Sequence, residues 1–205
     1  MRGGQALFHY NSGMGYEPEE ELSTEQKEIV SKIKSLSKTS KETGVGIRFS
    51  WNNYNGKVTC NIVKHYLGRR LRKGLKVVGP AFIKGLPMEF DILIVDEKAE
   101  PEEFTDAYDP KSVHLIVEVK SHGTYSEDAL KRIKQTFERL EREYGLKCAY
   151  LAIRESGRPK RGGRNWVKVT QELLKPYSSY FLSDSRTGDL YPNQWRQFVE
   201  YVNSF

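Results

Sequence analysis

The sequence has few features of secreted, membrane-spanning or zinc-stabilised proteins. Only two of its 205 residues are cysteines, Cys60 and Cys148, and neither has the CxxC spacing of a zinc site. The longest purely aliphatic runs, such as Ile92–Val95, are far shorter than the ~20 apolar residues that cross a bilayer. No apolar segment follows a basic start, so no signal peptide is expected. These absences predict an intracellular, cytoplasmic protein without membrane contact.

The composition is that of a folded chain with an excess of positive charge. Hydrophobic residues make up 38% and aromatic residues 12% of the sequence, whereas disordered chains are poor in aromatic and β-branched residues. The length suits one domain of ordinary size with its own core. The formal net charge of +6 is compatible with a polyanionic partner but does not require one.

The spacing of hydrophobic residues predicts helices and strands in a mixed order. Helical spacing is expected over residues 23–40, 57–73, 124–144 and 171–181, and in a last helix opened by Pro192. Strand patterns are expected over residues 45–51, 75–83, 88–96, 113–121, 148–153 and 166–169. This order predicts an α/β fold with a central mixed β-sheet flanked by helices.

Two regions are expected along the chain. Residues 1–55 form an N-terminal arm, a helix and a strand that pack on the core, and residues 56–205 form the core with a C-terminal helical extension. The last helix turns four apolar residues inward, and its aromatic residues serve a dimer contact as readily as the core. The four inward residues are Trp195, Phe198, Val199 and Val202, and the aromatic set is Trp195, Phe198 and Tyr201.

Charged residues interrupt two of the most aliphatic strands. Asp91 lies beside the run Ile92–Val95, and Glu118 and Lys120 interrupt the strand at 113–121. Because strand side chains alternate, Glu118 and Lys120 share one face. If the two strands are neighbours, the three side chains converge at one end of the sheet.

Charge in a buried strand needs a partner, a metal ion or a water-filled cleft. Two carboxylates on adjacent strands suit Mg²⁺, which takes oxygen ligands and completes its shell with water and phosphate. The same pattern also fits a buried ion pair of Lys120 with Glu118 or Asp91 that has no catalytic purpose. The charge pattern alone leaves both interpretations open.

The spacing of these residues resembles the PD-(D/E)xK nuclease signature of the restriction-endonuclease-like fold. Glu118-Val119-Lys120 begins 27 positions after Asp91, and a basic helix, three strands, a helix and a strand surround the motif over roughly residues 56–154. The resemblance implies that Asp91 and Glu118 are metal ligands and that the Val119 carbonyl is a third. It also implies that Lys120 is the catalytic lysine.

The sequence departs from the family pattern at two points. Position 90 is Phe where the motif has its proline, and the nearest proline is Pro87. Many relatives carry a further acid on the helix before the first strand, but residues 57–73 contain no Asp or Glu. Glu89, two residues before Asp91 and on the same face, is a candidate substitute.

Two clusters of basic residues are candidates for contacts with a nucleic acid beside such a site. Residues 64–76 carry six basic and no acidic residues, and residues 154–164 carry five basic residues and one acidic residue. Such clusters alone fit a solvated surface, but flanking a nuclease site they would hold the phosphate backbone of DNA. The candidate nucleic-acid-binding residues are Lys64, Arg69, Arg70, Arg72, Lys73, Arg158, Lys160, Arg161 and Arg164.

The resemblance implies a metal-dependent DNA endonuclease that hydrolyses phosphodiester bonds through a metal-activated water. Its cofactor would be Mg²⁺, with Mn²⁺ as a substitute, and its role restriction, junction resolution or repair. Cutting both strands with one site per subunit favours a homodimer. Two alternatives stay open: a non-catalytic nucleic-acid-binding protein on the same fold, and an unrelated α/β protein whose acidic segments 17–28 and 96–109 contact proteins.

Overall fold

The computed structural model describes residues 19–42, 48–124, 126–157 and 163–205. Most of the predicted N-terminal arm lies outside these residues, and so do three of the predicted DNA-binding residues, Arg158, Lys160 and Arg161. Within the described chain, no helix combines the length and the apolar character that a membrane crossing needs.

Helices and strands alternate along the described chain much as the hydrophobic spacing predicts. The helices are α1 Glu19–Glu42, α2 Arg48–Gly68, α3 Glu127–Tyr144, α4 Trp166–Leu174 and α5 Gln194–Val202, with a 3-10 turn at Pro110–Ser112. The strands are β1 Leu75–Val78, β2 Ala81–Ile83, β3 Glu89–Phe90, β4 Ile92–Asp96, β5 Ala107–Tyr108, β6 Val113–Lys120, β7 Lys147–Glu155 and β8 Ser178–Asp184.

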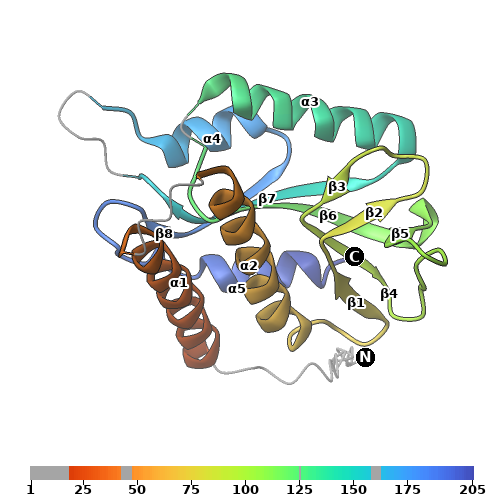
Figure 1. The fold of residues 1–205 in the computed structure, drawn as a ribbon, viewed down its shortest axis with the longest axis horizontal. Coiled ribbons are helices and arrows are strands. Elements are labelled where there is room, and N and C mark those ends of the chain that lie inside the picture. The colour runs from red at the N-terminus through yellow and green to blue at the C-terminus, as the bar shows by residue number, and fades with distance from the viewer. Residues whose placement is uncertain (1–18, 43–47, 125, 158–162) are drawn as a thin grey trace, which may run out of the picture.

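A five-stranded mixed sheet with the order β1-β4-β6-β7-β8 forms the centre of the fold (Figure 1). β1, β4 and β6 are antiparallel neighbours, whereas β6, β7 and β8 run parallel. A second sheet with the order β3-β2-β5 lies beside it and takes up part of the segment between β4 and β6. The mixed sheet flanked by helices that the sequence predicts is therefore confirmed.

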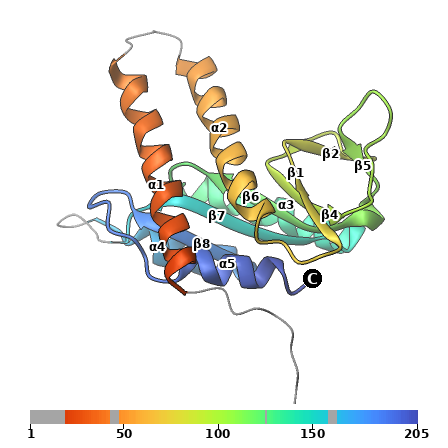
Figure 2. The same cartoon turned by 90° about the horizontal axis from the view of Figure 1, so that it is seen from below.

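The helices cover the two faces of the large sheet (Figures 1 and 2). One core cluster joins α1, α2 and α5 to residues of β4 and β6 such as Ile92 and Val117. The other joins α3, α4 and the small sheet to the alternate residues, such as Leu93 and Ile116. The strands are apolar on both faces because both faces are covered.

The N-terminal half contains the largest departure from the predicted elements. The predicted strand at 45–51 is wrong, because residues 48–51 are the first turn of α2. Residues 52–56, which precede the predicted helix at 57–73, are also helical, so α2 crosses the predicted boundary at residue 55. The alternating pattern is overridden because the apolar stripe of α2, with Cys60, Val63 and Leu67, packs on α1 and the sheet.

Other element boundaries differ for local reasons. The single strands expected at 75–83 and 88–96 are each divided in two, at Gly79-Pro80 and at Asp91. The cap of α3 is Ser126, whose side chain accepts a hydrogen bond from the Ala129 amide, so the helix begins three residues after the predicted start at 124.

The last strand and helix predictions are also partly wrong. Residues 166–169 begin α4 instead of forming a strand, because the Asn165 side chain caps the helix by accepting from the Lys168 amide. The helix predicted at 171–181 ends at Leu174, before Pro176, and Ser178 opens β8.

The last helix packs as predicted, and two of its three aromatic side chains are not available to a partner subunit. All four residues predicted to face inward are buried, and Trp195 and Phe198 have no exposed surface. The idea that these two aromatics form a dimer contact is therefore wrong, since the core of this same chain already covers them.

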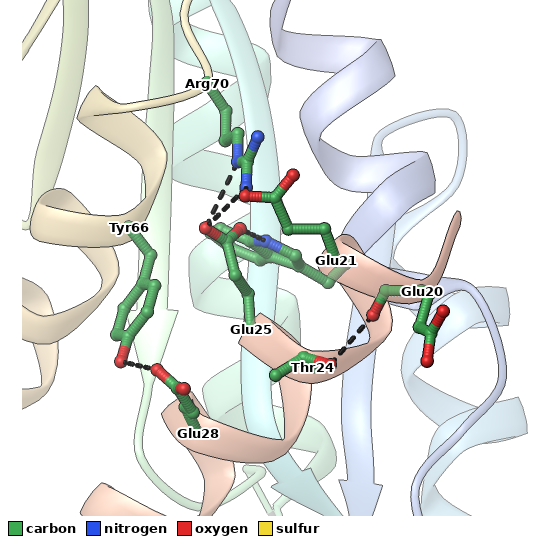
Figure 3. A network of polar contacts seen from close by, with 8 residues as sticks. Glu20, Glu21, Thr24, Glu25, Glu28, Tyr66 and Arg70 are labelled. Carbon is green, nitrogen blue, oxygen red and sulfur yellow. Dashed lines mark hydrogen bonds and ion pairs between the residues drawn. The ribbon is translucent and has the colours of Figure 1, made fainter. Parts of the chain in front are cut away.

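A buried polar network holds α1 against the rest of the helical layer (Figure 3). One Glu25 oxygen accepts hydrogen bonds from the Arg70 guanidinium at 3.0 and 3.1 Å, and the other accepts from the Trp195 indole at 2.9 Å. Glu21 adds an ion pair to Arg70 at 2.7 Å. The Glu25 and Arg70 side chains are only 9% and 7% exposed, so each charge depends on the other for compensation.

Replacing Glu25 should destabilise the fold strongly. Glu25→Ala leaves a buried guanidinium and a buried indole N–H without their acceptor, and we expect a loss of about 3 kcal/mol in the free energy of unfolding. Urea denaturation measures this loss. The control is Glu100→Ala, which removes an exposed ion pair with Lys76 and should cost less than about 1 kcal/mol. Equal effects of the two variants would contradict a structural role for the network.

Candidate active site

The antiparallel pairing of β4 and β6 brings the three interior charges to one end of the sheet. Ile92 lies opposite Val117, so Asp91, which directly precedes β4, and Glu118, which follows Val117, are at the same end. The structure thus places Asp91, Glu118 and Lys120 together, as the sequence predicts.

Asp91 sits in the bend between β3 and β4 and is held by backbone and side-chain donors. Its Oδ2 accepts a hydrogen bond from the Val119 amide at 2.8 Å, and the Cys60 thiol of α2 donates a second. Gly79 passes so close that a Cβ there would lie 2.3 Å from the Asp91 carbonyl oxygen. Only glycine fits at that position, which also has a φ of +137°.

Glu118 and Lys120 share the face of β6 that looks toward α3. Their neighbours Val117 and Val119 point the other way, into the core beneath α1, α2 and α5. The Lys120 ammonium forms an ion pair with Glu118 Oε1. The Glu118 side chain is 28% exposed and the Lys120 side chain is 35% exposed, so solvent can reach both.

Burial and mutual repulsion perturb the protonation of this cluster. Burial, with a contribution from the Glu118 carboxylate, raises the pKa of Asp91 from its usual 3.8 to about 6. Burial disfavours a charged Lys120, but the adjacent Glu118 carboxylate outweighs it and raises the pKa of the ammonium. Burial raises the pKa of the Cys60 thiol to about 12, so Cys60 stays protonated and acts as a donor rather than a metal ligand.

The donors at this end of the sheet suit a hard divalent cation. Asp91 and Glu118 offer carboxylate oxygens, and their repulsion, which contributes to the raised pKa of Asp91, is what a cation would offset. Across the described ranges, no three His, Cys, Asp or Glu side chains are grouped to hold a metal by themselves. An ion held by two carboxylates would complete its shell with backbone oxygen and water, as Mg²⁺ does.

Comparison with solved structures identifies the fold as a known one. The chain superposes on P. aeruginosa NucC in its cAAA-bound form with a TM-score of 0.61, at 11% identity, over 93% of this chain and 92% of that chain. E. coli NucC, also cAAA-bound, matches with a TM-score of 0.60 at 9% identity, over 94% and 93%. The chain has the restriction-endonuclease-like fold. No family model and no curated protein sequence matches it.

Within this restriction-endonuclease-like fold, the predicted DNA-contacting residues have different surroundings. Arg70 is buried in the network with Glu21 and Glu25. Lys64 donates to the Gly79 carbonyl at 2.7 Å. These two side chains hold the fold around Asp91 and α1, which argues against a DNA contact by either.

The remaining described members of the basic clusters lie nearer the surface. Arg69 and Lys73 are exposed in the segment between α2 and β1. Arg72 donates to the Phe205 carbonyl. Arg164 pairs with Glu127 in the first turn of α3. Among these, Arg72 and Arg164 already have partners within the described chain.

Sequence reasoning missed two residues that shape the site. Cys60 reads as one more apolar position in the stripe of α2, and its approach to Asp91 depends on how α2 packs. Gly79 gives only the general signal of a glycine before a proline, a turn, and its contact with Asp91 is set by the folded chain.

Glu155 was also missed, and it lies under the loop that follows Lys120. It has no exposed surface, and a Cβ at Gly123 would lie 1.7 Å from its Oε2. Its Oε1 accepts from the Ser156 amide at 2.9 Å, while Oε2 has no hydrogen-bond partner among the described residues. Burial, aided by the nearby Asp184 and opposed by the Ser156 amide, raises the pKa of Glu155 from 4.5 to about 7.

The raised pKa makes the contribution of Glu155 to stability depend on pH. Between 4.5 and about 7 the folded chain binds a proton here that the unfolded chain has lost, so stability falls as pH rises through that window. Relative to Glu155→Gln, the native protein should lose about 3 kcal/mol of unfolding free energy between pH 4.5 and 8. Urea denaturation at several pH values measures the difference.

A surface substitution provides the control for this pH effect. Glu172→Gln changes an exposed carboxylate of α4, and its stability profile should parallel that of the native protein. A Glu155→Gln profile parallel to the native one as well would show that Glu155 ionises normally in the folded chain.

Proposed function

We propose that this chain is a Mg²⁺-dependent DNA endonuclease that hydrolyses phosphodiester bonds. One observation carries the proposal: Asp91, Glu118 and Lys120 lie together, half-buried, at one end of the central sheet of a restriction-endonuclease-like fold. A carboxylate with a raised pKa beside a lysine that solvent can reach is typical of functional sites.

Asp91 and Glu118 are the proposed ligands of the metal, with the Val119 backbone carbonyl as a third. The Val119 amide and the Cys60 thiol orient the Asp91 carboxylate by donating to it. When bound, Mg²⁺ would lower the pKa of a water ligand and offset the charge that develops on the phosphate.

Lys120 is the proposed catalytic lysine. Its raised pKa keeps it cationic at neutral pH, so it is suited to orient an attacking water and to stabilise negative charge on the phosphate. In this structure the ammonium is paired with Glu118. If Glu118 held the metal, its oxygens would no longer be free to pair with Lys120, and the ammonium would be available to the substrate.

Exposed basic residues would hold the DNA backbone. We propose the cluster that ends at Arg164 beside the site, and Arg69 and Lys73 farther along the duplex, because they precede Gly74 and Leu75 at the end of the sheet that carries Asp96 and Glu97. Contacts of this kind position a duplex without reading its sequence and make binding dependent on salt. Two copies of the chain, each with one site, would cut both strands.

Cleavage of supercoiled plasmid and of a four-way junction tests the proposal. Native protein should cut with Mg²⁺ or Mn²⁺ and not in EDTA. Lys120→Ala, Asp91→Asn and Glu118→Gln should each lower the rate about a hundredfold or more, because each removes a group that acts on the reacting phosphate or its metal. The control Lys147→Ala removes an exposed lysine paired with Glu141 at the opposite end of the sheet and should cut like the native protein.

Each result of this assay has a defined meaning. Salt-dependent binding of both DNAs without cleavage, in all metals, would favour a nucleic-acid-binding protein on the same fold. The absence of both binding and cleavage would contradict any action on DNA and favour the acidic segments as the functional surface.

The assay includes one added condition. The two NucC structures that match over 93% and 94% of this chain contain cAAA, so each reaction is run with and without cAAA. Cleavage only in its presence would extend the likeness from fold to regulation, and equal cleavage would confine it to the fold.

A further inference from the structure

A pocket of about 320 Å³ opens beside Glu118 and Lys120, between the end of β6 and α3. Its lining changes character across its width. One wall is apolar, formed by Met88, Ile133 and Phe137, and the polar lining includes Arg132 and Thr136. The proposed catalytic groups therefore form one part of the boundary of a larger concave site.

Arg132 is the basic side chain of α3 that lacks a partner among the described residues. Lys131, Lys134 and Arg142 form ion pairs with acids of their own helix. Arg139 lies against the Met88 sulfur. Arg132 lines the pocket and is exposed, so its hydrogen-bond donors are within reach of an anion bound there.

The volume and the chemistry of the pocket match one nucleotide. Sites of about 300 Å³ or more hold small organic ligands, usually with an apolar lining and a few polar groups. Arginine presents a planar fork of donors that suits phosphate oxygens. Phosphate alone would make no favourable contact with the apolar wall, whereas the sugar and base attached to a phosphate could pack on it.

We propose that this pocket binds one deoxynucleotide of the strand that is cut. Its phosphate lies toward Arg132, and its sugar and base pack on Met88, Ile133 and Phe137. The inference rests on the proposed nuclease function, because it assigns a substrate contact to the same site. It makes Arg132 a positioning residue that holds the strand while Lys120 and the carboxylates act on the neighbouring bond.

Three variants separate the charge of the pocket from its volume. Arg132→Ala removes the phosphate partner. Ala129→Phe fills the pocket from the first turn of α3, since Ala129 is part of its lining. Arg142→Ala is the matched control, because it removes the same charge from the same helix in its last turn, away from the pocket.

Binding of thymidine 5′-monophosphate and of inorganic phosphate is measured by titration calorimetry in EDTA, where no cleavage occurs. Native protein should bind the nucleotide at least tenfold more tightly than phosphate. Arg132→Ala should weaken nucleotide binding about tenfold or more. Ala129→Phe should abolish the preference for the nucleotide, and Arg142→Ala should match the native protein.

Plasmid cleavage by the same variants provides the second readout. Arg132→Ala and Ala129→Phe should each lower kcat/KM about tenfold or more, mainly through KM, because they weaken substrate binding without removing the catalytic groups. Arg142→Ala should leave kcat/KM unchanged.

The outcomes distinguish this inference from the proposed function. Metal-dependent cleavage with no nucleotide preference, or with both pocket variants cutting like the native protein, would overturn the nucleotide pocket and leave the nuclease. Arg132-dependent nucleotide binding in a protein that cuts neither plasmid nor junction would support the pocket and overturn the nuclease.

Discussion

The antiparallel pairing of β4 with β6 is the constraint on which the candidate site depends. It aligns Ile92 with Val117, and the Val119 amide then donates to the Asp91 carboxylate across a separation of 28 residues. Any slip of register by one residue would turn Glu118 and Lys120 into the core and bring Val119 to the site. The apolar cores on both faces of the sheet fix that register, so the large hydrophobic clusters hold a small group of charges in place.

The protein tolerates unfavourable electrostatics at this end of the sheet. Two carboxylates share a half-buried space, and the pKa of Asp91 rises to about 6 because of burial and of Glu118. A structural ion pair with Lys120 needs only one carboxylate, and a second buried carboxylate costs free energy unless its charge is compensated. A second carboxylate beside a paired lysine is understandable if a cation binds there, and this is the physical basis of the proposed function.

The sequence predicts the parts of this site that follow from strand alternation, because charged residues within aliphatic strands can be recognised from the order of residues alone. It does not predict contacts that depend on packing between distant segments. Arg70 looked like a DNA contact, but Glu25, 45 residues earlier, buries its charge. Cys60 and Gly79 reach Asp91 only through the placement of α2 and of the β1–β2 connection. The strand expected at 45–51 failed because an alternating pattern of seven residues is weaker than the packing of a long helix on its neighbours.

A crystal structure of the protein with Mn²⁺, phased to locate the anomalous signal of the metal, tests the central claim most directly. The account predicts a peak within coordination distance of Asp91 and Glu118 oxygens, with the Lys120 ammonium displaced from its ion pair. A peak at other residues, or none here while Lys120 stays paired with Glu118 at saturating Mn²⁺, would contradict it and leave the three charges as a structural cluster.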